Sequence, residues 1–200
     1  MREKSIDLVR LAALSDGIFA VAMTLLAVGL PLPKDAAELG GRPLGEHLLT
    51  LFPQFRAVAI SFVVAAAFWR LHHNFFRVLA RGDGSLVWLN FLLLFGVVLT
   101  PLTTQLLGNL RATTATVDLY AGNLVLIGAA LFLMWWRAER HRLLHDDVGP
   151  ASVRRALFGS GTLVLVFLAS IPLSWARADL AEWFWLLLVP ISFLEARRRA

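Results

Sequence analysis

Apolar stretches long enough to cross a membrane recur along most of this chain. A helix of about 20 apolar residues spans the ~30 Å hydrocarbon layer of a bilayer, and a helix satisfies its own backbone hydrogen bonds inside lipid. The connections are short, although the Gly- and Pro-containing segment after the first stretch is a candidate for a short amphipathic helix. The sequence therefore predicts an all-α integral membrane protein, one six-helix transmembrane domain over residues 1–200. Its spans are expected at approximately 9–32, 55–76, 85–107, 117–136, 153–173 and 180–195.

Composition narrows the class of protein further. Of the 200 residues, 58% are hydrophobic and 16% are charged, and cysteine is absent. Disulfides and cysteine-based metal or redox sites are therefore excluded. Seventeen of the nineteen basic residues are Arg, and most lie outside the apolar stretches. In a membrane protein this distribution indicates topology, so we expect the lipid bilayer and not nucleic acid as the partner.

The basic residues also predict an orientation. Arg70 lies within a predicted span and is set aside. The segments on the outer side would then hold five basic residues, Lys34, Arg42, Arg56, Arg111 and Arg177. The inner segments would hold thirteen: Arg2, Lys4, Arg10, Arg77, Arg81, Arg137, Arg140, Arg142, Arg154, Arg155 and Arg197 to Arg199. Because basic residues concentrate in cytoplasmic loops, both termini are expected to be cytoplasmic, in a multi-pass protein of the cell membrane.

The first stretch carries ionisable residues that need an explanation. Arg10 and Asp16 interrupt it and no small-residue cleavage site follows, so we expect it to be retained as a span and not removed as a signal peptide. Ionisable residues within spans are costly and face protein or water, so Arg10, Ser15 and Asp16 require partners. Candidates for an imidazole or guanidinium partner lie in FWRLHHNFFR, at Arg70, His72, His73 and Asn74.

Two interpretations of this polar group remain open. A structural network is the simpler one, with Asn90 bonding across helices. Alternatively, protonation of His72 or His73 tunes gating near neutral pH, where imidazole titrates.

A stripe of side chains runs along the same predicted helix. At 100° per residue, Gly17, Val21, Thr24, Leu25 and Val28 share one face, and Ala13, Ala20 and Ala27 recur on a neighbouring flank. Small residues let another helix approach closely. If identical stripes from several subunits faced one another, they would form a stack of apolar rings with one ring of hydroxyls between them. Apolar constrictions of this kind gate ion flow by dewetting. The alternative is ordinary packing, with Thr24 bonded to its own helix.

Three motifs resemble the transmembrane protein 175 family of potassium channels. RLAALSDGIFAVAMTLLAVGL is similar to that family's first-helix signature, Arg-x-x-x-Phe-Ser-Asp-Gly followed by Phe-Ala-Ile-Ala, with Leu14 in place of Phe. FWRLHH is similar to its Phe-Trp-x-x-His, and LVWLNFLLLFGVVLTPL to its Leu-Trp-Leu-Asn and later Pro. These motifs cover about half of the chain.

The resemblance implies a prokaryotic homotetramer around a central pore lined by the first helix, with modest potassium selectivity and no backbone-carbonyl filter. It implies that Val21 forms the narrowest apolar ring of a hydrophobic gate, that Leu25 and Val28 form further rings, and that Thr24 forms the selectivity ring. Arg10, Ser15, Asp16 and the second-helix His72 would hold the inner mouth, with Asn90 in the same polar network. The expected ligands are permeant K⁺ ions, with no cofactor and no resident metal.

Two other functions are considered. A secondary or proton-coupled transporter would use Asp16 and His72 as a relay, although no inverted repeat is evident. A membrane enzyme would need clustered polar groups, and HRLLHDD offers His141 and His145 at i, i+4 spacing beside Asp146 and Asp147. A solvated loop explains that segment better, so no enzyme is predicted.

Overall fold

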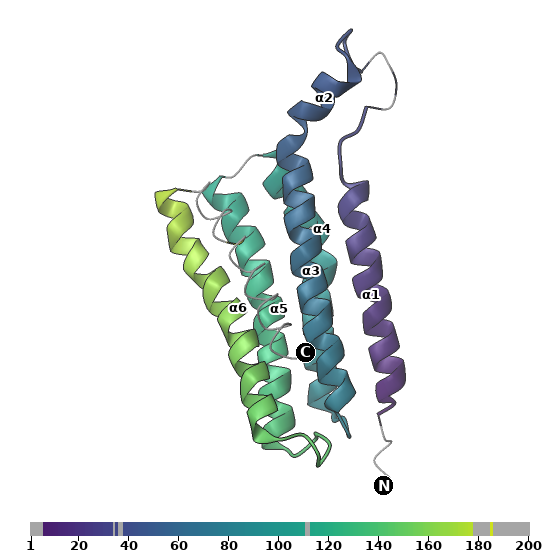
Figure 1. The fold of residues 1–200 in the computed structure, drawn as a ribbon, viewed down its shortest axis with the longest axis vertical. Coiled ribbons are helices and arrows are strands. Elements are labelled where there is room, and N and C mark those ends of the chain that lie inside the picture. Colours follow the sequence, from purple (N-terminus) through teal and green to yellow (C-terminus); the bar gives the residue numbers. More distant parts are fainter. Residues whose placement is uncertain (1–5, 34, 36–37, 111–112, 178–184, 186–200) are drawn as a thin grey trace.

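The protein is a bundle of long α-helices whose axes run side by side (Figure 1). The computed structural model describes residues 6–33, 35, 38–110, 113–177 and 185. Their helices are α1 (Leu8–Val28), α2 (Leu44–Thr50), α3 (Phe52–Val78), α4 (Gly84–Asn109), α5 (Thr114–Arg140) and α6 (Pro150–Ala176). All of these except the short α2 are long and apolar enough to cross a membrane. The prediction of an all-helical membrane protein is confirmed. The predicted span at 180–195 lies outside the described residues except for Trp185.

Short polar side chains define where several helices begin. The Asp7 carboxylate accepts the Arg10 N–H at the start of α1, and Thr113 and Thr116 form a reciprocal capping box at the start of α5. These contacts satisfy backbone donors that have no partner within the first turn. The expected short helix in the connection after α1 is α2, which extends beyond the end of the bundle (Figure 1).

Glycines allow the later helices to pack closely. A Cβ atom at Gly96 of α4 would lie 2.6 Å from Ile127 Cγ1 of α5, and a Cβ atom at Gly128 would lie 2.9 Å from Val164 Cγ2 of α6. Small residues at such crossings bring helix backbones close enough for extensive van der Waals contact, which is the main attraction between helices in lipid. α5 is consequently the most buried of the helices and lies between α4 and α6.

α1 lies at the edge of this bundle. Its neighbours are α3 and α4, whereas α5 packs on the other side of α4 (Figure 1). This edge position leaves much of the α1 surface uncovered by its own chain.

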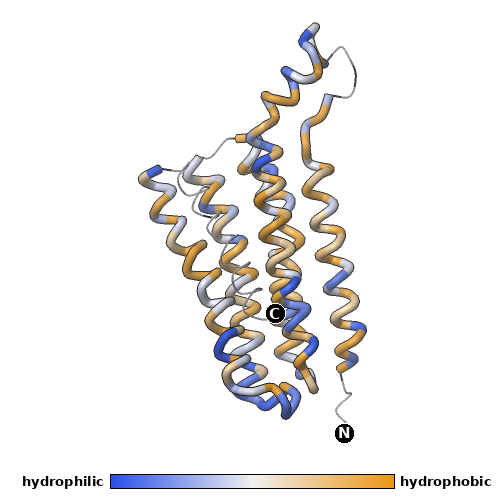
Figure 2. The backbone as a smooth tube through the Cα atoms, in the orientation of Figure 1, coloured by the Kyte–Doolittle hydropathy of each residue, from blue (hydrophilic) through white to orange (hydrophobic). Residues whose placement is uncertain are grey.

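Hydrophilic residues gather at one end of the bundle (Figure 2). This basic end contains the start of α1 and the α3–α4 and α5–α6 connections. The two connections pair through their backbones, with Ala80 N–H donating to Leu143 O at 2.9 Å and His145 N–H donating to Val78 O at 3.0 Å. The described basic side chains there are Arg10, Arg77, Arg81, Arg137, Arg140, Arg142, Arg154 and Arg155.

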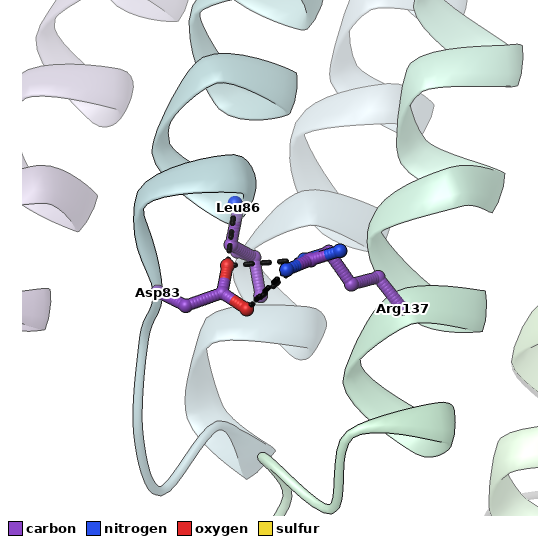
Figure 3. A network of polar contacts seen from close by, with 3 residues as sticks. All are labelled: Asp83, Leu86 and Arg137. Carbon is purple, nitrogen blue, oxygen red and sulfur yellow. Dashed lines mark hydrogen bonds and ion pairs between the residues drawn. The ribbon is translucent and has the colours of Figure 1, made fainter.

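An ion pair joins α4 to α5 at this end (Figure 3). Arg137 Nη2 lies 2.7 Å from Asp83 Oδ2, and Arg137 Nε donates to the same carboxylate. Asp83 also caps α4 by accepting the Leu86 N–H at 2.8 Å. The hydrogen bonds from Arg137 are the main reason that the pKa of Asp83 is lowered, against the opposing effect of partial burial.

We expect Asp83→Asn to reduce stability by about 1 kcal/mol at neutral pH, because the ion pair is lost while Asn still caps the helix. A depressed folded-state pKa gives stabilisation that is complete above the unfolded value of about 4 and declines as pH falls through the folded value. The difference in melting temperature between wild type and variant, measured by tryptophan fluorescence in detergent, should therefore persist from pH 7 to 5 and shrink below about pH 4. If this difference in melting temperature disappeared between pH 7 and 5, the stabilising role of the Asp83–Arg137 ion pair would be contradicted.

Candidate functional site

α1 has one face buried within its own subunit. The buried residues follow helical spacing and are Leu11, Ser15, Phe19, Ala22 and Leu26. They contact α3 and α4, which are the neighbours of α1. This single buried stripe fixes the rotation of α1 about its axis.

The opposite side of α1 is exposed. Val21 is 57% exposed and Val28 is 76% exposed, and Gly17, Thr24 and Leu25 are exposed as well. At 100° per residue, the centre of this exposed stripe points roughly away from the centre of the buried one. The stripe that the sequence singled out is therefore not covered by its own subunit.

Two open grooves flank the exposed stripe. Leu14, Val21 and Leu25 form one side of a groove of about 480 Å³ whose other wall includes Val98 of α4. Thr24 and Ala27 line a second groove of about 770 Å³ with Phe62 and other residues of α3. Both grooves are mainly apolar. α1 thus stands out from the subunit as a ridge with space on either side.

The Thr24 hydroxyl is bonded to its own helix. It lies 2.8 Å from Ala20 O and 2.8 Å from Val21 O, and its proton is directed to these carbonyl oxygens. A hydroxyl has one proton and two lone pairs. Because the proton is engaged on the helix, Thr24 offers acceptor lone pairs on the exposed side.

Three polar side chains from different helices meet on the buried side of α1. Asn90 Nδ2 of α4 donates to Ser15 Oγ of α1 at 3.1 Å, and Asn90 Oδ1 lies 2.8 Å from His72 Nε2 of α3. All three residues are almost fully buried, and Ser15 Oγ donates to Leu11 O at 2.8 Å. The His72 ring is also flanked by Phe19 and Phe76. This polar triad, Ser15, His72 and Asn90, joins α1, α3 and α4 at one level.

The other two residues of the expected network, Arg10 and Asp16, have hydrogen-bond partners outside the triad. Asp16 Oδ1 accepts a hydrogen bond from Trp69 Nε1 at 2.8 Å, where the sequence favoured an imidazole or guanidinium partner. Consecutive helical residues point 100° apart, so Ser15 reaches the buried junction while Asp16 reaches the edge of α3. Arg10 donates its backbone N–H to the Asp7 carboxylate. Among the described residues, its exposed side chain takes part neither in the polar triad nor in the contact between Asp16 and Trp69.

A buried hydroxyl cluster was not anticipated from the sequence. Thr104 Oγ1 of α4 donates to Ser61 Oγ of α3 at 2.8 Å, and Ser61 Oγ donates to the Tyr120 hydroxyl of α5 at 3.0 Å. The available signal was the presence of hydroxyl side chains within three apolar stretches. Their mutual contact depends on helix packing, which local pattern does not specify.

The loop 141–147, considered above as a possible enzyme site, takes part in the structure of the basic end. His141 directly follows α5, and the His145 backbone pairs with the α3–α4 connection. Among the described residues, no group of three or more His, Asp or Glu side chains is arranged to hold a metal ion.

Known proteins resemble this chain in both sequence and fold. The family model for the endosomal/lysosomal potassium channel TMEM175 matches residues 10–101. A potassium channel from Streptomyces collinus is 34% identical over 161 residues, covering 77% of each chain. The chain belongs to the TMEM175 family. A potassium channel from Chamaesiphon minutus is 32% identical over 176 residues, covering 83% of this chain and 85% of its own.

A solved TMEM175 structure has the same fold. The crystal structure of a lysosomal potassium-selective channel TMEM175 homologue from Chamaesiphon minutus matches with a TM-score of 0.78 and 28% identity, covering 94% of this chain and 97% of that one. Residues 10–101, which the TMEM175 family model matches, include nearly all of α1, all of α3 and most of α4. These three helices carry the polar triad. These relatives are ion channels and not enzymes, so the family supports an ion channel in a membrane.

Ser15 and Ser160 provide a matched test of the polar triad. Both are almost fully buried, and both donate to the carbonyl oxygen four residues earlier at 2.8 Å, but Ser15 also accepts from Asn90. Ser15→Ala should destabilise the fold by about 1–3 kcal/mol because the Asn90 amide loses its acceptor, whereas Ser160→Ala should have little effect. Melting temperatures in detergent measure both variants. Equal losses would mean that the contact to Asn90 contributes nothing.

Proposed function

We propose that this protein is a potassium-permeable cation channel, in which four copies surround a central pore lined by α1. The observation that carries the proposal is the exposed stripe from Gly17 to Val28, which the subunit leaves uncovered. The tetramer is the number implied by the family resemblance. The relatives that are named potassium channels support K⁺ as the permeant ion.

The ridge shape of α1 supports a shared axis. Four ridges can converge at the centre of an assembly, while the grooves beside each ridge accept side chains from neighbouring subunits. Gly17, Ala13 and Ala20 keep the approach close because small residues allow helix backbones to near one another.

Apolar side chains would control the flow of ions. Val21, Leu25 and Val28 would each contribute a ring of methyl groups around the axis, and water leaves narrow apolar rings readily. An ion that loses its water there gains no compensating ligands. The rings therefore act as a hydrophobic gate, and opening requires the α1 helices to move apart or rotate.

Thr24 would provide oxygen atoms between the apolar rings. Its proton is directed to its own helix, so the lone pairs would face the ion. Four hydroxyl oxygens replace only part of the hydration shell of K⁺, in contrast to filters built from rings of backbone carbonyls. The expected selectivity for K⁺ over Na⁺ is therefore modest.

The polar triad would hold the inner part of α1 in place during gating. Rotation of α1 would separate Ser15 from Asn90 and leave buried polar groups without partners, at a cost of about 1–3 kcal/mol for each group. That cost favours movement of the outer half of α1, beyond Ala20, over rotation of the whole helix. The triad thus acts as a fixed point for the gate.

The basic end of the bundle is proposed to face the cytoplasm of the cell. Its Arg residues outnumber the basic residues of the other end, and basic loops remain on the cytoplasmic side. The N-terminus would then be cytoplasmic, and the predicted span at 180–195, which lies outside the described residues except for Trp185, would return the C-terminus to the same side.

The selectivity experiment uses the purified protein in planar bilayers with K⁺ and Na⁺ gradients. The wild type should carry a current whose reversal potential favours K⁺ modestly. Thr24→Val, which keeps the shape of the side chain but removes its oxygen, should lower the K⁺ preference, and Thr24→Ser should retain it. Coupled, saturable uptake without channel current in any gradient would contradict the channel and favour a transporter.

A second experiment tests the hydrophobic gate. Val21→Asn should increase the resting current by about tenfold or more, because a polar ring keeps the constriction wet. Leu165→Asn is the matched control, since Leu165 is a similarly exposed apolar residue on α6, remote from α1. An unchanged resting current in Val21→Asn channels that still insert and fold would remove Val21 from the gate.

A further inference from the structure

An open groove lies between the start of α4 and the end of α5, away from α1. It has a volume of about 740 Å³. Its apolar walls are formed by Trp88, Phe91 and Leu92 of α4 and by Leu133 and Trp136 of α5. All five side chains are exposed, and Trp88 is 76% exposed. A contiguous set of exposed large apolar side chains indicates contact with lipid or with another molecule.

The groove changes character along its length. Toward the centre of the bundle it is lined by Phe91, Leu92 and Leu133, and toward the basic end it is lined by Ser85 and Arg137. Trp88 and Trp136 lie between these two parts in the sequence of each helix. Tryptophan is enriched where hydrocarbon meets the polar headgroups of a bilayer. The groove therefore has an apolar end, an aromatic middle and a polar mouth.

Arg140 adds a cation to the mouth. Its guanidinium carbon lies 5.6 Å from the centroid of the Trp136 ring, which itself lines the groove. Arg137, by contrast, is held by the Asp83 carboxylate, which offsets its charge (Figure 3). Arg140 is thus positioned to attract an anion at the mouth of the groove.

From this gradient we infer that the α4–α5 groove binds an anionic glycerophospholipid from the bilayer, with an acyl chain along Phe91 and Leu133 and its phosphate at Arg140. The chemistry matches at both ends, because a lipid has an apolar chain and a charged headgroup separated by a glycerol at the interface. Basic pockets between membrane helices on the cytoplasmic side bind such headgroups. The inference rests on the orientation and assembly proposed above.

The position of the groove favours a lipid over a second copy of the chain. α1 has α3 and α4 as neighbours, and α5 packs on the other side of α4. If the α1 ridges converge on an axis, α5 lies toward the periphery of the assembly. The groove then opens to the bilayer.

The headgroup decides which lipid binds. Replacing one acyl chain by another in the groove exchanges similar apolar contacts, because lipid tails are as apolar as the side chains. One basic residue near a membrane surface gives about a fivefold preference for an anionic headgroup over a zwitterionic one. Arg140 should therefore change the ratio of affinities, and the aromatic walls should change both affinities together.

Lipid binding to the full-length chain in neutral detergent tests this inference. Phosphatidylglycerol and phosphatidylcholine with identical acyl chains are titrated, and native mass spectrometry gives each affinity. We expect the wild type to prefer phosphatidylglycerol, Arg140→Gln to reduce that preference about fivefold, and Trp88→Ala to weaken both lipids without changing their ratio. Glycerol phosphate without acyl chains should not bind.

Arg154→Gln is the matched control, because it removes the same charge from the same end of the bundle but on α6. It should leave the ratio unchanged. Equal reductions in the Arg140 and Arg154 variants would show a diffuse surface charge and overturn the site. The measurement requires no ion current, so it is distinguishable from a failure of the channel proposal.

A cysteine probe distinguishes lipid from protein in the groove. The chain has no cysteine, so Ser85→Cys, at the polar mouth of the groove, introduces a single thiol and keeps the aromatic walls. In vesicles of phosphatidylglycerol, bound lipid should protect that thiol from a membrane-soluble maleimide more than in vesicles of phosphatidylcholine. Equal protection that is lost when the protein is diluted in lipid would indicate that another copy of the chain covers the groove, and equal protection at every dilution would mean that the headgroup does not decide binding. Either result would overturn the inference.

Discussion

Polar groups buried inside a membrane protein must be paired within the protein, and this requirement fixes the orientation of α1. Ser15 is bound to Asn90, which in turn contacts His72, so α1 is tied to α3 and α4 at one level. Rotating α1 by even one residue would replace Ser15 at this junction by a neighbour and leave the Asn90 amide without an acceptor. The exposed stripe containing Val21 is therefore a direct consequence of the buried one.

The remaining helices serve as a scaffold for this arrangement. α4, α5 and α6 pack closely through glycines at Gly96 and Gly128, and the Asp83–Arg137 ion pair links α4 to α5 at the basic end. α1, in contrast, rests on its neighbours along a single stripe. A firmly packed scaffold with a ridge at its edge suits an assembly in which the ridges move while the remainder stays in place.

The sequence predicts the parts of the structure that depend on local pattern. Hydropathy identifies the long helices, and the 100° period places Val21 and Thr24 on the face of α1 opposite Phe19. The indole partner of Asp16 and the Asp83–Arg137 pair are not predictable in this way, because they depend on how helices distant in sequence rotate against one another. The family resemblance groups Asn90 with Ser15 and His72, and the packing of three helices determines which atoms of these side chains meet.

The central claim is that copies of α1 direct Val21 toward a common axis. Electron cryo-microscopy of the protein reconstituted in lipid nanodiscs tests this most directly, at a resolution sufficient to separate helices and their large side chains. The account predicts a four-fold particle with α1 innermost and the Val21 side facing the axis. A particle in which that side of α1 faces lipid, or in which another helix lines the axis, would contradict it.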